Sequence, residues 1–201
     1  MNTPTQVRVA ITGGIGTGKS AFAQIIEGKG FPVIKADELA KHLMSTHKSI
    51  KTRIIKSFGK ESYSGDSLNT EHIAKIVFPD PEKTKILNSI VHPIVINEIK
   101  KMLDKEPSPL VFCEAALIFE ARMTPLFDYV VLITAEEPLR IQRVVDRDKV
   151  TPESVLLRMQ NQMSEIEKNK RSHYIFENNG TLKELESKAN LLITLLNPRK
   201  A

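Results

Sequence analysis

The chain has 201 residues, of which 41% are apolar, so it can bury a sizeable core as one compact body with inserted lobes. Its formal net charge of +5 favours an anionic partner, such as a phosphorylated metabolite, a nucleic acid or an acidic membrane surface. Trp is absent and aromatic residues make up only 5%, so the base-stacking side chains of single-strand binders are scarce. This scarcity argues against nucleic acid as the partner.

No stretch approaches the roughly 20 consecutive apolar residues that span a bilayer, and Met1–Gln6 lack the apolar stretch of a signal peptide. We therefore expect a cytoplasmic protein without a membrane partner. The single cysteine, Cys113, follows Val111 and Phe112 and has no Cys or His nearby at a metal-ligand spacing. We expect it to be a buried structural thiol.

Short apolar runs alternate with longer amphipathic ones, which is typical of an α/β fold. The first strand is predicted over 7–12 and is followed by a helix over about 18–29, in which Phe22, Ile25 and Ile26 recur at helical spacing. Apolar runs predict further strands at 33–34, 110–114, 129–134 and, as a late edge strand, 174–176.

Two polar regions interrupt this pattern. Residues 37–109 carry helical patterns with charged faces and no convincing strand, so we expect a helical insertion that forms a substrate lobe. Residues 136–171 predict a lid of two helices joined at 148–150, with Thr151 as N-cap and Pro152 at the first helical position. Residues 1–36, 110–135 and 172–201 then form the nucleotide-binding core.

A glycine-rich loop lies between the first strand and the first helix. Its residues match the pattern of Gly, any four residues, Gly, Lys, then Ser or Thr: Gly13, Gly14, Ile15, Gly16, Thr17, Gly18, Lys19 and Ser20. Such glycines let backbone N–H groups and a helix N-terminus point at phosphate oxygens, while the lysine adds positive charge and the serine hydroxyl holds Mg²⁺. The alternative is a flexible glycine turn. The loop predicts a three-layer α/β fold of the P-loop NTPase class, with a central parallel sheet, a helical substrate insertion and a helical lid.

A phosphate loop alone does not separate kinases from GTPases or motor ATPases. The guanine-reading pattern Asn-Lys-x-Asp is absent, because Asn169-Lys170 is followed by Arg171-Ser172. This absence disfavours a GTPase switch. Ala21 stands where many such loops place a second hydroxyl, so one phosphate contact is expected to be missing.

A kinase that phosphorylates a hydroxyl benefits from a carboxylate that takes its proton. Asp37 follows the predicted strand 33–34, near the strand ends where ligands of open α/β sheets bind, but it could equally be an N-cap. Glu114 ends an apolar strand, which suggests a metal or substrate carboxylate rather than an exposed strand end. His92 precedes Pro93, which should start or kink a helix; its role is either structural or substrate-binding.

Arg140, Arg143 and Arg147 are spaced by three and four, which places them on one helix face. Such arginines can close over ATP and offset the charge of phosphoryl transfer, and Arg158 and Gln162 are predicted on one face of a returning helix. The alternative is a solvated helix whose arginines have acidic neighbours, namely Glu136, Glu137, Asp146 and Asp148.

Together, these segments resemble the dephospho-coenzyme A kinase family over nearly the whole chain. The resemblance rests on residues 11–20, 33–37 (Val-Ile-Lys-Ala-Asp), 90–93 (Ile-Val-His-Pro), 117–120 (Leu-Ile-Phe-Glu), 142–148, 158–162 and 178–180 (Asn-Asn-Gly). It implies transfer of the γ-phosphoryl group of ATP to the ribose 3′-hydroxyl of dephospho-coenzyme A, with Mg²⁺. It further implies that Asp37 is the base and that the phosphate charge is offset by Lys19, Arg143 and Arg147. ATP then contacts residues 13–21, Arg143 and Asn178, and the acceptor contacts Asp37, His92, Glu114, Leu117, Ile118 and Arg158.

The chain departs from the family pattern at several positions. Lys35 replaces the first Asp of an Asp-Ala-Asp signature, Glu114 stands where Asp is usual, Ala116 replaces a proline, and Ser172-His173 replaces a common Ala-Asp pair. Lys35 reverses a charge near the expected acceptor. Another small-molecule or nucleoside monophosphate kinase, a nucleic-acid-stimulated ATPase and a catalytically weak nucleotide-binding module therefore remain as alternatives.

Overall fold

The computed structural model describes residues 6–77 and 79–197 and divides the chain into two compact units. Unit 1 comprises the chain up to Lys35 and again from Leu103, and unit 2 is Ala36–Met102. Residues 1–5, on which the signal-peptide expectation partly depends, lie outside the described residues.

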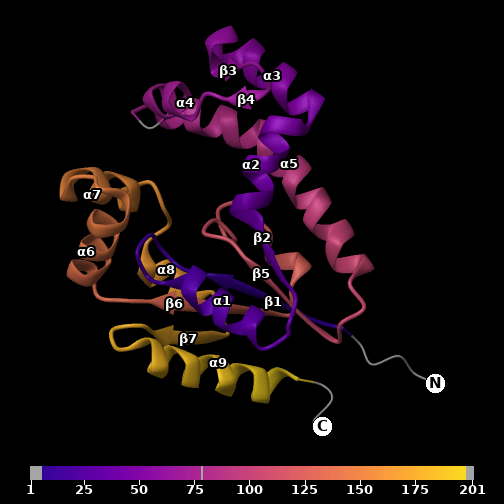
Figure 1. Cartoon of the computed structure of the whole chain (residues 1–201), viewed down its shortest axis with the longest axis vertical. Helices are drawn as coiled ribbons and strands as arrows, with labels where there is room; N and C mark the ends of the chain where they lie inside the picture. The colour runs from indigo at the N-terminus through magenta and orange to yellow at the C-terminus, as the bar shows by residue number, and fades with distance from the viewer. Residues whose placement is uncertain (1–5, 78, 198–201) are drawn as a thin grey trace. The chain divides into compact units, whose positions relative to one another are not determined.

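Unit 1 is built on a five-stranded parallel sheet in the order β2-β5-β1-β6-β7 (Figure 1). The strands are β1 (Val7–Thr12), β2 (Val33–Lys35), β5 (Leu110–Glu114), β6 (Tyr129–Thr134) and β7 (Tyr174–Glu177). All the strands expected from apolar runs are confirmed, with β7 at the edge. The central parallel sheet and its flanking helices confirm the predicted three-layer α/β class.

One face of this sheet is covered by α1 (Lys19–Gly28) and α9 (Leu182–Leu196), which pack side by side (Figure 1). Alternate residues of β1, such as Val9 and Ile11, point into this layer because successive strand residues face opposite sides. Phe22 of α1 is fully buried there, with its ring centroid 5.8 Å from that of Phe176. Cys113 is also fully buried, as expected.

The region 136–171 contains the two predicted helices, α6 (Glu137–Asp148) and α7 (Pro152–Gln160), and a third helix, α8 (Glu165–Lys170), that was not predicted. Thr151 caps α7 by accepting the Ser154 N–H, as predicted. The additional helix begins at Ser164, whose hydroxyl accepts the Glu167 N–H. Ser-x-x-Glu is a known helix-start signal, but α8 is too short to show an apolar periodicity.

Unit 2 is mainly helical, with α2 (Ala36–Thr46), α3 (Lys48–Phe58), α4 (Thr70–Val77), α5 (Pro81–Lys105), which ends in unit 1, and a 3₁₀ turn at Lys60–Ser62. It also contains a hairpin of β3 (Tyr63–Ser64) and β4 (Ser67–Leu68), so the expectation of no strand is wrong. These strands are too short for an alternating pattern, and their signal is the turn at Gly65, where φ is 62°.

Helix α5 continues through Pro93, so Pro93 does not start a helix, and the alternative that it kinks one stays a prediction. Proline removes one backbone donor but leaves its carbonyl in the helix ladder, and a helix of 25 residues retains many other hydrogen bonds.

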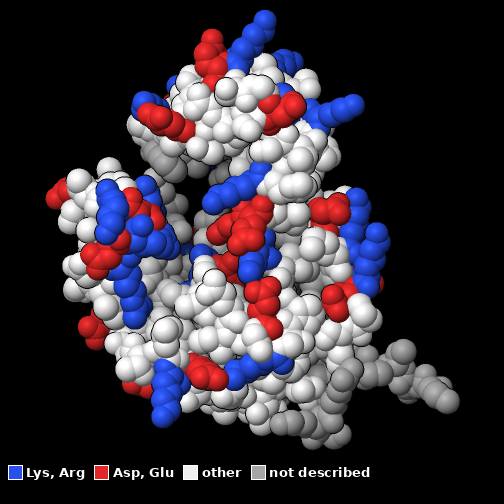
Figure 2. Space-filling view, viewed as in Figure 1, with Lys and Arg blue, Asp and Glu red and all other residues white. Residues whose placement is uncertain are grey.

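No described helix is both long and apolar enough to cross a membrane. On the face drawn in Figure 2, Lys and Arg side chains of the described residues are interspersed with Asp and Glu, without a continuous basic stripe.

Helix α9 begins with a capping box at Thr181. The Thr181 hydroxyl accepts the Glu184 N–H at 3.3 Å, and the Glu184 carboxylate accepts the Thr181 N–H at 3.5 Å. Thr181→Ala should lower the free energy of unfolding by about 1 kcal/mol, because an orphan N–H loses its acceptor. Thr181→Ser should retain most of the stability in urea unfolding, and equal losses in both variants would contradict this role of the hydroxyl.

Candidate functional site: the phosphate loop and its surroundings

The phosphate loop connects β1 to α1 in a conformation that requires glycine. Gly16 and Gly18 have φ of 80° and 89°, in the left-handed region that side chains disfavour. A Cβ on Gly16 would collide with the Arg140 carbonyl, and one on Gly18 with the Asn178 amide. The Asn178 Nδ2 donates to the Thr17 carbonyl at 2.9 Å, so this buried side chain holds the loop where α1 begins.

Glu114 joins the two residues that end the loop. Its Oε1 lies 3.1 Å from the Lys19 Nζ and accepts a hydrogen bond from the Ser20 hydroxyl, also at 3.1 Å. The Glu114 side chain is only 6% exposed. A nearly buried carboxylate needs such partners. The structure thus brings Glu114 together with Lys19 and Ser20.

These groups also fit a Mg²⁺ ion. Mg²⁺ prefers a few protein oxygens together with phosphate oxygens over an all-protein cage, and Ser20 and Glu114 offer a hydroxyl and a carboxylate at the loop. The described residues contain no group of three or more His, Cys, Asp or Glu side chains arranged to hold a metal. The donor set therefore suits an ion that arrives with a phosphorylated ligand.

A cavity of about 250 Å³ lies against the loop. Arg143 and Arg147 of α6 line it together with Gly16, Lys19 and Ser20. The Arg143 guanidinium donates to the Asn178 carbonyl at 2.9 Å and to the Gly16 carbonyl at 3.5 Å. Three cationic side chains thus surround one small cavity, as an anionic ligand requires.

Three of the predicted lid arginines pair with acidic side chains. Arg147 Nε and Arg158 NH1 lie 2.7 and 3.0 Å from carboxylate oxygens of Asp148. Hydrogen bonds, first from Arg147 and then from Arg158, hold the pKa of Asp148 below its ordinary value. Arg140 is only 8% exposed and pairs with Glu165 at 2.6 Å, so it is not part of a solvent-facing cationic surface.

Gln162 follows the end of α7, so its predicted place on a helix face with Arg158 is wrong. Its Oε1 instead accepts the Ile15 N–H at 3.0 Å, which brings Gln162 to the phosphate loop. Helix periodicity could not predict this contact, because the chain leaves the helix before reaching Gln162.

The acceptor-side residues are divided between the units. Leu117 and Ile118 follow β5 in unit 1, where Ile118 is fully buried. Asp37 and His92 belong to unit 2, and their roles remain predictions. Asp37 is the second residue of α2, so its interpretation as an N-cap is wrong. The Lys35 ammonium lies 3.0 Å from a Glu27 carboxylate oxygen, which partly offsets the reversed charge at this position.

A buried lysine next to the loop could not be predicted from the sequence. Lys168 is 1% exposed and lies 3.2 Å from Glu120 Oε1. It lines a second cavity of about 400 Å³ with Gly14, Arg140 and Gln162. A lysine among charged residues of a short helix gives no sequence signal of burial.

Comparison with known proteins agrees with this geometry. Residues 7–184 match the family model described as dephospho-CoA kinase. The chain belongs to the dephospho-CoA kinase family. A dephospho-CoA kinase of Salinibacter ruber is 37% identical over 185 residues, which cover 90% of this chain and 93% of the relative.

Solved structures support the same family fold. A Thermus thermophilus protein superposes with a TM-score of 0.83 at 33% identity, covering 96% of this chain and 99% of that protein. The dephospho-CoA kinase of Campylobacter jejuni superposes with a TM-score of 0.69 at 26% identity, covering 96% of this chain and 98% of that enzyme.

Gly18→Ala should weaken ADP binding by more than about tenfold, because a Cβ in the left-handed conformation strains the loop and displaces Asn178. Gly28→Ala is the matched control, since a Cβ there meets nothing within 4 Å. Isothermal titration with ADP checks both variants. ADP affinity retained in Gly18→Ala would contradict the proposed loop geometry.

Proposed function

We propose that this protein transfers the γ-phosphoryl group of ATP to the ribose 3′-hydroxyl of dephospho-CoA, giving CoA and ADP. Membership of the dephospho-CoA kinase family supports the substrate and the reaction. The observation that carries the proposal is the loop cavity, where Lys19, Arg143 and Arg147 gather beside backbone N–H groups. This arrangement suits a polyphosphate at the helix N-terminus. We place the reaction in the cytoplasm.

In this proposal, residues 13–21 bind the phosphates of ATP, and Arg143 and Asn178 complete its site. Lys19, Arg143 and Arg147 offset the charge that develops on the transferred group. Ser20 would hold a Mg²⁺ ion, with Glu114 beside it, and the ion would neutralise phosphate charge when bound. Glu114 and Asp148 hold Lys19 and Arg147 in place.

On the acceptor side, the Asp37 carboxylate takes the proton of the 3′-hydroxyl. The oxygen of that hydroxyl then bonds to the γ-phosphorus, and the bond between the γ-phosphorus and ADP breaks. The side chains of His92, Leu117 and Arg158 contact dephospho-CoA, and Ile118, which is fully buried, is not part of this contact surface. Exclusion of water from this site protects the γ-phosphoryl group from hydrolysis. We assign residues 37–109 to the acceptor lobe and 136–171 to the lid.

The function is tested by ADP release with ATP and Mg²⁺, with dephospho-CoA, AMP, other nucleosides or single-stranded nucleic acid as the added component. Dephospho-CoA should accelerate ADP release and yield a product with the mass of CoA. Acceleration by AMP would indicate a nucleoside monophosphate kinase. Stimulation by nucleic acid that weakens steeply with salt would indicate the ATPase alternative.

Asp37→Asn should lower kcat by about a hundredfold or more while ATP affinity stays nearly intact, because only the proton acceptor is lost. Glu38→Gln is a matched control, since Glu38 is the neighbouring exposed carboxylate of α2. Steady-state kinetics with saturating ATP checks both. An unchanged kcat in Asp37→Asn would remove Asp37 from the role of base.

Lys19→Ala should lower turnover with every acceptor, because Lys19 acts on ATP itself. The measurement is ADP release with each acceptor that supports turnover in the unmodified enzyme. Full activity in the variant would overturn the assignment of the phosphate loop.

A further inference from the structure

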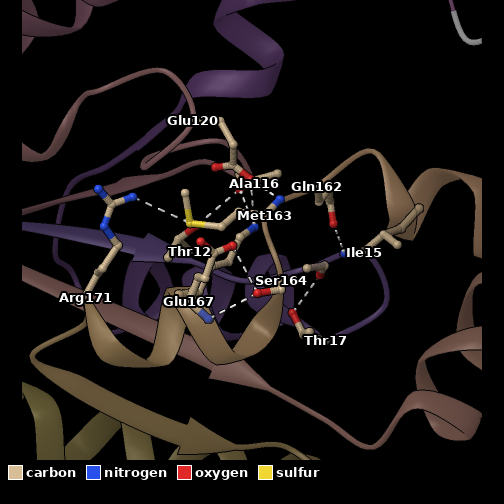
Figure 3. A network of polar contacts seen from close by, with 12 residues as sticks. Thr12, Ile15, Thr17, Ala116, Glu120, Gln162, Met163, Ser164, Glu167 and Arg171 are labelled. Atoms are coloured by element: carbon tan, nitrogen blue, oxygen red, sulfur yellow. Dashed lines mark hydrogen bonds and ion pairs between the residues drawn. The ribbon is translucent and has the colours of Figure 1, made fainter. Parts of the chain in front are cut away.

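The segment Gln162–Lys168 contacts both the phosphate loop and the segment after β5 (Figure 3). Gln162 Oε1 accepts the Ile15 N–H at 3.0 Å. The next residue, Met163, donates its own N–H to Glu120 Oε1 at 2.9 Å. Two neighbouring residues thus connect the nucleotide side to the segment that contains Leu117 and Ile118. We call Gln162–Lys168 the clamp.

The clamp and Arg140 hold Ile15 of the phosphate loop from two sides. While Gln162 binds its N–H, Arg140 Nε donates to its carbonyl at 3.0 Å. The same arginine pairs with Glu165 of the clamp at 2.6 Å. The contacts therefore close a ring from Ile15 through Gln162 and Glu165 to Arg140 and back to Ile15. Gly14 permits this approach, because a Cβ there would collide with the Arg140 guanidinium.

The other end of the clamp is fixed by a buried ion pair. The Lys168 ammonium lies 3.2 Å from Glu120 Oε1 and donates to the Ala116 carbonyl at 3.3 Å. The Thr12 hydroxyl, at the end of β1, donates to the same carbonyl at 3.3 Å (Figure 3). Because a buried ammonium is strongly destabilised without partners, Lys168 ties the clamp to residues 116–120.

Glu120 accepts both clamp contacts through a single oxygen. Its Oε1 receives the Met163 N–H and the Lys168 ammonium, whereas its Oε2 is buried without a hydrogen-bond partner among the described residues. A shift of residues 116–120 would therefore move Met163. It would also move Gln162, which is joined to Met163 by a peptide bond. This connection has the physical continuity that coupling between two sites requires.

We propose that Gln162 and Arg140 are positioning residues that hold Ile15 in the nucleotide-binding conformation of the loop, and that Glu120 couples this positioning to the acceptor. Fixing the loop in advance reduces the conformational entropy that nucleotide binding must remove. If the acceptor contacts Leu117, acceptor binding changes the affinity for ADP by a certain factor, and ADP binding changes the affinity for the acceptor by the same factor. The coupling rests on the proposed function, but the positioning does not.

The positioning is tested by ADP titration of Gln162→Ala without an acceptor. Loss of one neutral hydrogen bond should weaken ADP binding by about fivefold. Asn161→Ala is the matched control, because Asn161 is the adjacent exposed amide and lies outside the ring of contacts. The melting temperature and circular dichroism of both variants should match those of the unmodified protein. Unchanged ADP affinity in Gln162→Ala, or an equal loss in Asn161→Ala, would overturn the positioning role.

The coupling is tested by repeating the titration at saturating dephospho-CoA with Glu120→Gln, a variant of nearly identical shape. In the unmodified protein, the acceptor should change ADP affinity. In the variant this change should be smaller, because glutamine keeps an accepting oxygen but loses the ion pair with Lys168. A purely structural role would alter both ADP affinities by one factor and leave their ratio unchanged, which would overturn the coupling. If dephospho-CoA does not bind at all, the proposed acceptor fails, whereas the result for Gln162→Ala still decides the positioning.

Discussion

The absence of a Cβ at three glycines of the phosphate loop is the constraint on which the site depends. At Gly14, Gly16 and Gly18, a side-chain carbon would occupy the space of Arg140 or Asn178. Without these glycines, Arg140 of α6 and Asn178, the residue after β7, could not reach the loop backbone. The loop is therefore held in place by side chains from residues distant in sequence. This preorganisation is what a phosphoryl transfer site needs, because there is little covalent chemistry for the protein to perform.

The cationic side chains around the loop are also held by contacts within the protein. Each of these cations has an acceptor within the protein: Lys19 pairs with Glu114, Arg147 with Asp148, and Arg143 donates to the carbonyls of Gly16 and Asn178. Such contacts keep the long side chains beside the loop. Phosphate oxygens can replace the internal acceptors at a modest free-energy cost where the acceptor is partly exposed. Lys168 differs, because it is fully buried and its pair with Glu120 is part of the scaffold.

Much of the architecture could be predicted from the sequence because the unit 1 strands are continuous apolar runs, as buried parallel strands require. The phosphate loop could be predicted because its glycines, Lys19 and Ser20 form a specific local pattern. The short elements could not, since α8 and the β3–β4 hairpin are too short for periodicity. The contacts of Gln162 and Lys168 could not be predicted either, because they join segments more than 40 residues apart in the sequence. Asp37 could be located on the sequence, but its role depends on the family resemblance.

The most direct test of the account is the fate of the γ-phosphoryl group in a single turnover. Enzyme in excess over γ-³²P-labelled ATP is mixed with dephospho-CoA and Mg²⁺, and the products are separated and digested to locate the label. The account predicts that the label appears in the 3′-phosphate of CoA, with little in inorganic phosphate. Label released mainly as inorganic phosphate, with or without dephospho-CoA, would contradict the account, because the site would then deliver the phosphoryl group to water.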